Sequence, residues 1–326
     1  MTDRPTASLR VAAIDCGTNS IRLLIGDVDP TTGVITDHVR RMEIVRLGHG
    51  VDRTGVIDPA AMARTLGVCV DYAQQCRDYG VERIKFVATS ASRDARNADD
   101  FVAGVHEAFG ELDVTPTVIR GSEEARLSFL GATGDLVAAG AQGPYLVVDI
   151  GGGSTELVRG TDSVEASRSI DIGCVRMTER HLTTDPPTAD EIAAATADID
   201  AQIDAGATDV DFSAVRTLVG LAGSVTTVTA QVLHLPAYDP EAIHLATATP
   251  AQVQRACAEL LAMPRDERAA LGYMHPGRVD VIGAGALVWS RVIERVCRDS
   301  GLGDDLPVVT SEHDILDGIA LSLVGR

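Results

Sequence analysis

Two stretches of the sequence share one pattern, in which an apolar run ends in aspartate, a glycine-containing turn follows, and a second apolar run begins. The later stretch, residues 145–160, reads Tyr-Leu-Val-Val-Asp-Ile-Gly-Gly-Gly-Ser-Thr-Glu-Leu-Val-Arg-Gly. The earlier stretch, residues 12–26, reads Ala-Ala-Ile-Asp-Cys-Gly-Thr-Asn-Ser-Ile-Arg-Leu-Leu-Ile-Gly. Short apolar runs rich in β-branched residues are typical of buried strands. Each stretch therefore predicts a β-hairpin with a tight turn.

The two stretches also match in register. Five pairs of positions correspond, namely Asp15 with Asp149, Gly17 with Gly151, Ser20 with Ser154, Leu23 with Leu157 and Gly26 with Gly160. One such turn would be a weak signal, because it occurs in many unrelated sheets. Two in register indicate a duplicated domain with a cleft between the halves.

The later turn is suited to binding an anion. Gly151, Gly152 and Gly153 have no side chains to block the approach of phosphate oxygens to their backbone N–H groups. Ser154 and Thr155 add hydroxyl donors. Neither glycine turn is followed by Gly-Lys-Ser/Thr, which excludes a Walker-type phosphate loop.

Four motifs in one order resemble the exopolyphosphatase/guanosine pentaphosphatase family, within the actin, Hsp70 and sugar-kinase superfamily. They are Asp-Cys-Gly-Thr-Asn-Ser-Ile-Arg, Ala-Thr-Ser-Ala-Ser-Arg-Asp-Ala-Arg-Asn (88–97), Gly-Ser-Glu-Glu-Ala-Arg (121–126) and Asp-Ile-Gly-Gly-Gly-Ser-Thr-Glu. The resemblance runs from about residue 10 to the C-terminus. It implies an α/β fold of two duplicated actin-like (ribonuclease H-like) domains with an interdomain cleft. We expect residues 1–124 with 310–326 to form the first domain, because the last helix returns to it, and 125–309 to form the second.

Composition limits the remaining possibilities. The 326 residues are enough for two domains, each with its own core. A net charge of −19 disfavours binding to nucleic acid or to anionic membranes, and Lys85 is the only lysine, so arginine must supply the positive charge at any anion site. The polar N-terminus, residues 1–9, and the lack of a long apolar run predict no signal peptide and no membrane span, hence a cytoplasmic protein. The six cysteines include no Cys-x-x-Cys pair, which argues against a zinc ribbon or a redox motif.

The hydrophobic pattern predicts alternating strands and helices. In the first half we expect strands at 9–15, 21–29, 34–45, 84–89 and 114–119, and helices at 58–79, 97–109 and 122–130. In the second half we expect strands at 145–150, 155–160, 164–172, 215–221 and 307–310, and helices at 174–182, 187–205, 225–233, 250–262, 276–299 and 311–323.

Hydrolysis of a phosphoanhydride needs cradled phosphate oxygens, a metal, an in-line water and a base. Asp149 and Glu156 are the best candidate metal ligands, and Asp15 is the next. Oxygen ligands beside a phosphate suit Mg²⁺, with Mn²⁺ as an alternative. In the alternative structural interpretation, the two aspartates only close their turns and Glu156 is a solvated strand residue.

The base is expected in the pair Glu123 and Glu124. The family has its catalytic glutamate in this pair, at the hinge between domains. Adjacent residues at a helix start point about 100° apart, so one of the two would face the water. The spacing to the second glycine turn, compared with the family pattern, favours Glu124 over Glu123. Alternatively, both are acids favoured by the positive end of the helix dipole.

The expected substrate-binding residues surround the two turns. The cradles are Gly17, Thr18, Asn19 and Ser20 in the first and Gly151, Gly152, Gly153, Ser154 and Thr155 in the second. Two arginines are candidate phosphate clamps: Arg22 holds the repeat position of Glu156, and Arg93 follows a strand in a predicted loop. Arg278 resembles a family arginine at the far side of the cleft, and Gly223-Ser224 resembles the superfamily's nucleoside loop, although this chain has Ala-Gly-Ser where Gly-Gly-Thr is expected. Asn97 either caps the next helix or contacts substrate.

The resemblance implies an exopolyphosphatase that removes terminal phosphate from linear polyphosphate with Mg²⁺ and a glutamate-activated water. The alternatives are a guanosine pentaphosphate 5'-phosphohydrolase using the same site and a non-catalytic sensor that binds alarmone or polyphosphate. We expect inorganic polyphosphate as the partner, guanosine tetra- or pentaphosphate as a second ligand, and a homodimer. The resemblance implies that longer family members carry an added C-terminal metal-dependent module. We expect none in this chain, and we expect His313-Asp314 to lack partner histidines.

Overall fold

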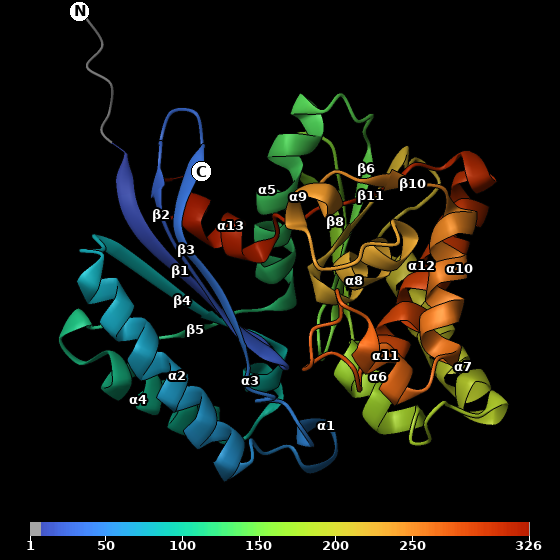
Figure 1. Ribbon diagram of the computed structural model, residues 1–326. Helices are drawn as coiled ribbons and strands as arrows, with labels where there is room; N and C mark the ends of the chain where they lie inside the picture. Colours follow the sequence, from blue (N-terminus) through green and yellow to red (C-terminus); the bar gives the residue numbers. More distant parts are fainter. Residues whose placement is uncertain (1–7, 326) are drawn as a thin grey trace, which may run out of the picture. The chain divides into compact units, whose positions relative to one another are not determined.

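The computed structural model describes residues 8–325. The chain divides into two compact units, of which the first ends at Gly131 and resumes at Ile315, and the second is Ala132–Asp314. Each unit contains one mixed β-sheet with helices packed on it (Figure 1). Most of the N-terminal stretch that was expected not to be a signal peptide, residues 1–7, lies outside the described part of the chain.

The first unit is built on a five-stranded sheet with the order β3-β2-β1-β4-β5. Its strands are β1 Leu9–Cys16, β2 Ser20–Val28, β3 Ile35–Ile44, β4 Arg83–Ala88 and β5 Thr117–Val118. Its helices are α1 Val51–Thr54, α2 Pro59–Asp78, α3 Ser90–Asp94, α4 Ala98–Phe109, the 3₁₀ turn η1 Gly110–Leu112, the first part of α5 Gly121–Ala138, and α13 Ile315–Ser322.

Alternation along β1 buries both faces of this sheet. Ala12, Ile14 and Cys16 belong to one core cluster, which holds the buried side chains of α2 and α4. Val11 and Ala13 point the other way, into a second cluster with the apolar side chains of α13. The last helix is thus a core element of the first unit, and Figure 1 shows it against the sheet.

The second unit repeats this strand order. Its strands are β6 Tyr145–Ile150, β7 Thr155–Gly160, β8 Val164–Ile170, β9 Thr217–Leu221, β10 Thr247–Ala248 and β11 Val308–Thr310. The order β8-β7-β6-β9-β11 reproduces β3-β2-β1-β4-β5, with the same antiparallel and parallel pairings, and β10 adds an edge. The predicted α/β fold with a duplicated domain is therefore confirmed.

The helices of the second unit pack around one large core cluster. They are α6 Cys174–His181, α7 Ala189–Ala207, α8 Ala222–Val232, α9 Pro240–Ile243, α10 Pro250–Ala262, α11 Arg265–Ala270, α12 Ile282–Ser300 and the 3₁₀ turn η2 Gly303–Asp305. On α12, Val288, Trp289 and Val292 are fully buried and lie on one face of the helix.

Several element boundaries differ from the prediction for local reasons. Helix α12 starts at Ile282 rather than 276, because Pro276-Gly277 forms a turn that Arg278 N closes on His275 O at 2.8 Å. Strand β5 is two residues long, and the preceding Pro116 cannot donate a ladder hydrogen bond. Helix α5 continues past the predicted end at 130 to Ala138, and the burial of Leu136 compensates for the low helix propensity of its glycines. Helix α13 starts at Ile315 rather than 311.

All six cysteines are unpaired thiols, and all but Cys297 are buried. Burial raises the pKa of Cys16 and Cys69, so both are neutral packing residues. In the described part of the chain, the helices are too short or too polar to cross a membrane.

Candidate functional site

The two glycine turns have the same backbone geometry. Gly17 N donates to Ser20 O at 2.9 Å in the first, and Gly151 N donates to Ser154 O at 3.0 Å in the second. Across the flanking strands, Asp15 is directly opposite Arg22, and Asp149 is directly opposite Glu156. Residues that the sequence alignment of the two hairpins pairs with each other therefore occupy the same place in their own hairpins.

The first turn is linked to helix α3. Thr18 Oγ1 lies 2.8 Å from Ser90 Oγ in a buried hydrogen bond, and Thr18 O accepts from Gly48 N at 2.8 Å. Ser90, which sequence reasoning did not single out as a site residue, is in the 88–97 motif but gives no separate signal there. It fixes the position of the first turn relative to α3.

Arg22 forms an ion pair with Asp15. Its Nη2 is 2.7 Å and its Nε 3.0 Å from Asp15 Oδ2, and Asp15 is buried. This pairing places a guanidinium beside the first turn, while it also partly neutralises the aspartate.

Glutamate 124 is held by an arginine from α3. Arg93 Nη1 donates to Glu124 Oε2 at 3.1 Å and to Ile119 O at 3.1 Å, and Glu124 is only 8% exposed. Arg93 lies on α3, not in the predicted loop. Helix α3 therefore contacts both neighbours: Ser90 binds Thr18 in the first turn, and Arg93 binds Glu124 at the start of α5.

Glutamate 123 has a different environment. Its carboxylate receives 2.8 and 2.9 Å hydrogen bonds from Arg126, one helical turn further on, and both side chains are solvent-accessible. The hydrogen bond from Arg126 lowers the pKa of Glu123. Asn97 occupies the N-cap position of α4, but its side chain makes no capping hydrogen bond. Its amide instead accepts from Ile57 N at 2.8 Å and donates to Ile57 O at 3.2 Å.

The second turn is packed against the start of α6. Cys174 N donates to Gly151 O at 2.9 Å, and Arg176 Nε donates to Gly153 O at 2.6 Å. A Cβ atom on Gly173 would overlap the backbone of Gly152 and Gly153, so this position has no room for a side chain. Sequence reasoning missed Gly173 and Arg176, which lie about twenty residues after the turn they support.

Asp149 and Glu156 are both buried beside the second turn, at 6% and 1% exposure. Directly opposed residues of an antiparallel pair project from the same face of the sheet. Glu156 Oε1 accepts hydrogen bonds from Ser154 Oγ at 2.9 Å and Ser169 Oγ at 2.7 Å. Two adjacent buried carboxylates disfavour each other's charge, and a hard divalent cation with oxygen ligands fits this donor set.

The N-terminus of α8 forms a third part of the second unit's polar region. Gly223 and Ser224 lie in its first turn, because the helix starts at Ala222 rather than at the predicted Val225. A Cβ on Gly223 would overlap the guanidinium of Arg278, whose Nη1 donates to Thr227 Oγ1 at 3.2 Å. A helix N-terminus with an adjacent guanidinium favours an anion.

Ser224 connects this helix to the second turn. Its side chain lies close to Cys174, the residue that donates to Gly151, since a Cβ on Gly285 would meet both side chains. Burial raises the pKa of Cys174, so the thiol is neutral and serves packing. The predicted residues Gly151, Ser224 and Arg278 are thus brought into one connected group within the second unit.

Comparison with known proteins identifies the family of the chain and a similar protein. The sequence model of the Ppx/GppA phosphatase family matches residues 25–303. Exopolyphosphatase 2 of Mycobacterium tuberculosis is 49% identical over 323 residues, which are 98% of this chain and 100% of that protein.

Solved structures agree in fold. A crystal structure of an exopolyphosphatase-like protein has 42% identity and a TM-score of 0.92, with 98% of each chain covered. The crystal structure of the Aquifex aeolicus member of the Ppx/GppA family has 30% identity and a TM-score of 0.78, with 97% of each chain covered.

Proposed function

We propose that the chain, which belongs to the Ppx/GppA phosphatase family, is an exopolyphosphatase that hydrolyses the terminal phosphoanhydride of linear polyphosphate. The observation that carries the proposal is the pair of equivalent Asp-x-Gly turns, each with its own set of charged side chains. The first unit adds Glu124 held by Arg93, and the second adds the buried pair Asp149 and Glu156. Similarity to a named exopolyphosphatase over the whole of its length supports this substrate class.

The backbone N–H groups and hydroxyls of the two turns would bind phosphate oxygens. Gly17 to Ser20 form one cradle and Gly151 to Thr155 the other, and Arg22 contributes positive charge beside the first. At the N-terminus of α8, Gly223, Ser224 and Arg278 offer a further anion subsite for a following phosphate.

Asp149 and Glu156, with Asp15 as the next candidate, would hold Mg²⁺ or Mn²⁺. A bound ion of this kind neutralises charge on the phosphate oxygens. The two serine hydroxyls on Glu156 Oε1 fix that carboxylate in place, so its orientation is set before an ion arrives.

Glu124 would orient and deprotonate the attacking water. Its burial and its contact with Arg93 support this role over Glu123, which is committed to Arg126 on the helix surface. Arg93, expected as a phosphate clamp, is in this proposal also the residue that positions the base. The action of both turns on one phosphate, with the base between them, stays a prediction.

One comparison of substrates tests the proposal. Phosphate release from short polyphosphate, long polyphosphate and guanosine pentaphosphate is measured side by side with Mg²⁺ and with Mn²⁺. We expect the highest kcat/KM on polyphosphate. A preference for guanosine pentaphosphate would select the alternative hydrolase, and binding of either ligand without any release would select the sensor. We also propose that the chain forms a homodimer, and sedimentation velocity tests this by measuring the mass of the particle in solution.

A further inference from the structure

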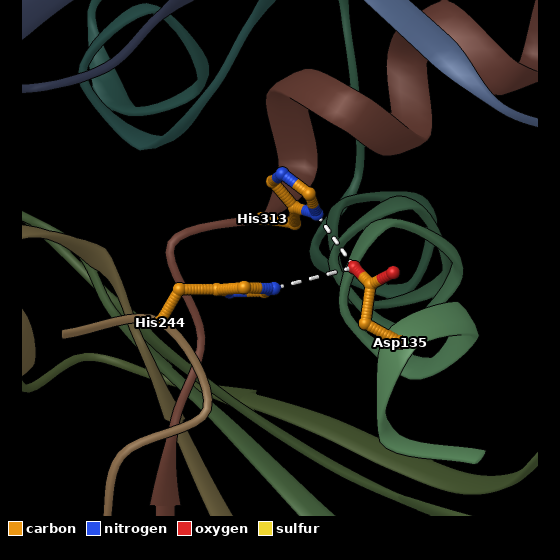
Figure 2. A group of neighbouring side chains, drawn as sticks. All are labelled: Asp135, His244 and His313. Atoms are coloured by element: carbon orange, nitrogen blue, oxygen red, sulfur yellow. Dashed lines mark hydrogen bonds and ion pairs between the residues drawn. The ribbon is translucent and has the colours of Figure 1, made fainter. Parts of the chain in front are cut away.

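Two histidines and an aspartate meet in the second unit, outside the residues assigned above. The His–Asp–His cluster consists of Asp135 on α5, His244 directly after α9, and His313 in the segment between β11 and α13 (Figure 2). The sequence suggested that His313 lacks a partner histidine, and this was wrong. His244 is 69 residues away in the chain, so no short sequence motif joins the two histidines.

Both imidazoles converge on one carboxylate oxygen. His313 Nδ1 lies 2.6 Å and His244 Nε2 lies 3.6 Å from Asp135 Oδ2. Figure 2 shows both rings directed at this carboxylate. The three ligand atoms lie within 4.8 Å of one another, and the ring centroids are 4.5 Å apart. The side chains are 43%, 23% and 42% exposed for Asp135, His244 and His313, so an ion from solvent has access.

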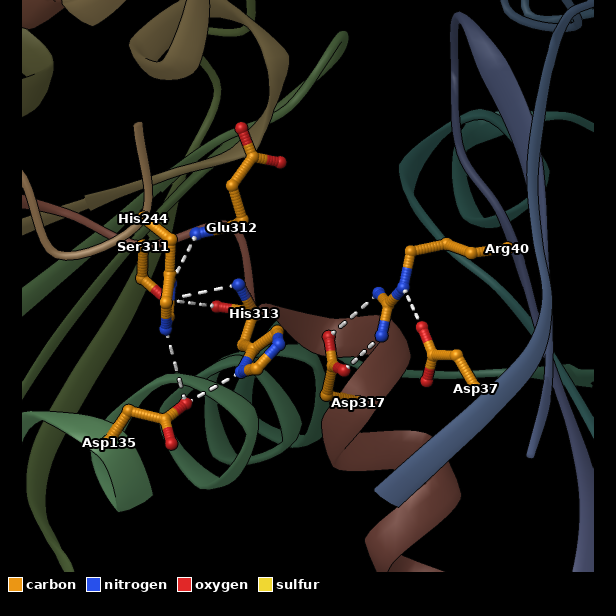
Figure 3. Close-up of polar contacts among 8 residues, drawn as sticks. All are labelled: Asp37, Arg40, Asp135, His244, Ser311, Glu312, His313 and Asp317. Carbon is orange, nitrogen blue, oxygen red and sulfur yellow. Dashed lines mark hydrogen bonds and ion pairs between the residues drawn. The ribbon is translucent and has the colours of Figure 1, made fainter. Parts of the chain in front are cut away.

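Local hydrogen bonds fix the two histidines before any ligand binds. Ser311 Oγ donates to His313 O at 2.8 Å and accepts from His313 N at 3.1 Å (Figure 3). After His244, Leu245 adopts a left-handed conformation with φ 60° and donates from its N to Thr310 O at 2.8 Å. A non-glycine residue in this conformation is strained, so the surrounding structure must hold the turn firmly.

We propose that the His–Asp–His cluster is a binding site for a transition-metal ion of the Zn²⁺ class, distinct from the candidate Mg²⁺ site. Two imidazole nitrogens and one carboxylate oxygen are ligands that Zn²⁺ prefers, whereas Mg²⁺ prefers oxygen alone. Bonds of about 2.0–2.2 Å in a tetrahedral site place neighbouring ligand atoms about 3.3 Å apart. The 2.6 and 3.6 Å separations lie on either side of that value and all three ligand atoms lie within 4.8 Å of one another, so shifts of about 1 Å would complete the site. Water would take the fourth position.

When a metal ion binds, each neutral imidazole keeps its one ring proton, but that proton moves to the other ring nitrogen. Glu312 N donates to His244 Nδ1 at 3.3 Å, which keeps the proton of the neutral ring on Nε2, toward Asp135 (Figure 3). Coordination through Nε2 moves that proton to Nδ1 and gives up this long hydrogen bond. On His313, coordination through Nδ1 moves the ring proton to Nε2.

The ligands come from three segments that are distant in sequence. An ion would join the part of α5 in the second unit to the turn after α9 and to the segment that leaves β11. Zn²⁺ should therefore stabilise this unit, in addition to binding it.

Isothermal titration of the full chain with Zn²⁺, in excess Mg²⁺ so that the oxygen site is filled, tests the proposal. His181→Gln is the matched control, because His181 Nε2 also pairs with an aspartate, Asp198, at 2.8 Å but lies outside the cluster. Wild type and this control should bind one Zn²⁺. His244→Gln and His313→Gln should each lose at least about tenfold in affinity, since even an outer-shell change costs about 10–100-fold.

Two further readouts make the result independent of the hydrolytic activity. Co²⁺ should give the visible absorption of a tetrahedral site in wild type but not in the His244→Gln/His313→Gln double variant. Zn²⁺ should raise the Tm of wild type and control only, with circular dichroism confirming that the double variant is folded. Equal Zn²⁺ binding in all variants would place the ion elsewhere, and absence of binding would leave the cluster a hydrogen-bonded group; either result overturns the proposal.

Discussion

Replacement of Gly173 by alanine is the sharpest test of how the second turn is held. The backbone of Gly173 has φ −88° and ψ 159°, which any residue can adopt, so space alone decides the outcome. An added Cβ would meet the carbonyl carbon and oxygen of Gly152 and the nitrogen of Gly153. All three atoms lie more than 1 Å inside the 3.4 Å at which ordinary van der Waals contact begins. Because these are backbone atoms, the turn itself must move by about 1 Å.

Displacement of the second turn should lower both the stability of the Gly173→Ala protein and its kcat/KM. Overpacking of this kind costs about 1–3 kcal/mol. At about 2–4 °C per kcal/mol for a unit of this size, the Tm should fall by about 2–12 °C. If the turn binds the reacting phosphate, a displacement of about 1 Å should lower kcat/KM by about 100-fold.

The assay compares Gly173→Ala with Gly67→Ala in thermal unfolding and in phosphate release. Gly67 lies in α2 and a Cβ there meets no atom within 4 Å, so the same chemical change should stabilise slightly, by about 0.5–1 kcal/mol. A Gly173→Ala protein with unchanged Tm would refute the packing argument. A lower Tm with unchanged kcat/KM at a temperature where the variant is folded would refute the role of this turn in phosphate binding.

Three other predictions concern the base, the metal and the entry to α8. Glu124→Gln should lower kcat by about two to four orders of magnitude with polyphosphate binding retained, whereas Glu123→Gln should stay near wild type; steady-state kinetics that show the reverse would exchange their roles. Chelation should abolish phosphate release, and full activity in chelator would contradict the metal assignment. Asp149→Ala should raise the Mg²⁺ concentration for half-maximal activity at least about tenfold. Ala222 adopts φ 66°, so Ala222→Gly should raise the free energy of unfolding by about 1 kcal/mol in urea titrations and keep activity; a loss of stability would show that the strain is absent.

The parts of the fold that could be predicted from sequence are those determined by local pattern. Alternating apolar residues and the matching turns gave both hairpins, and Asp58 before Pro59 gave the start of α2, where Asp58 Oδ1 accepts from Ala60 N and Ala61 N. The structure places Asp149 directly opposite Glu156, a register that follows from the length of the predicted turn between them. These inferences needed no contact between residues distant in sequence.

The parts that could not be predicted depend on distant contacts. Nothing near Gly173 in the sequence shows that it packs on Gly152, and nothing near His313 shows that His244 is beside it. The short helix α3 carries Arg93 because the preceding strand β4 delivers it beside the first turn, not because its sequence has strong helix propensity. Such positions become visible only when the sheet order brings separate segments together.

One of the differences between the duplicated hairpins predicts different roles for the two turns. Arg22 and Glu156 occupy equivalent places, each directly opposite an aspartate. In the first unit the arginine neutralises Asp15 through a 2.7 Å ion pair. In the second, a carboxylate stands where the arginine would be, and two buried acids share one face of the sheet. Carboxylate oxygens on one face are ligands that a hard divalent cation prefers. We therefore expect the second turn to carry the metal, while the first turn carries the guanidinium that meets the phosphate directly. An Arg22→Glu exchange should accordingly weaken polyphosphate binding without creating a second site of equal metal affinity, since Glu156 alone has the serine hydroxyls that hold it in place.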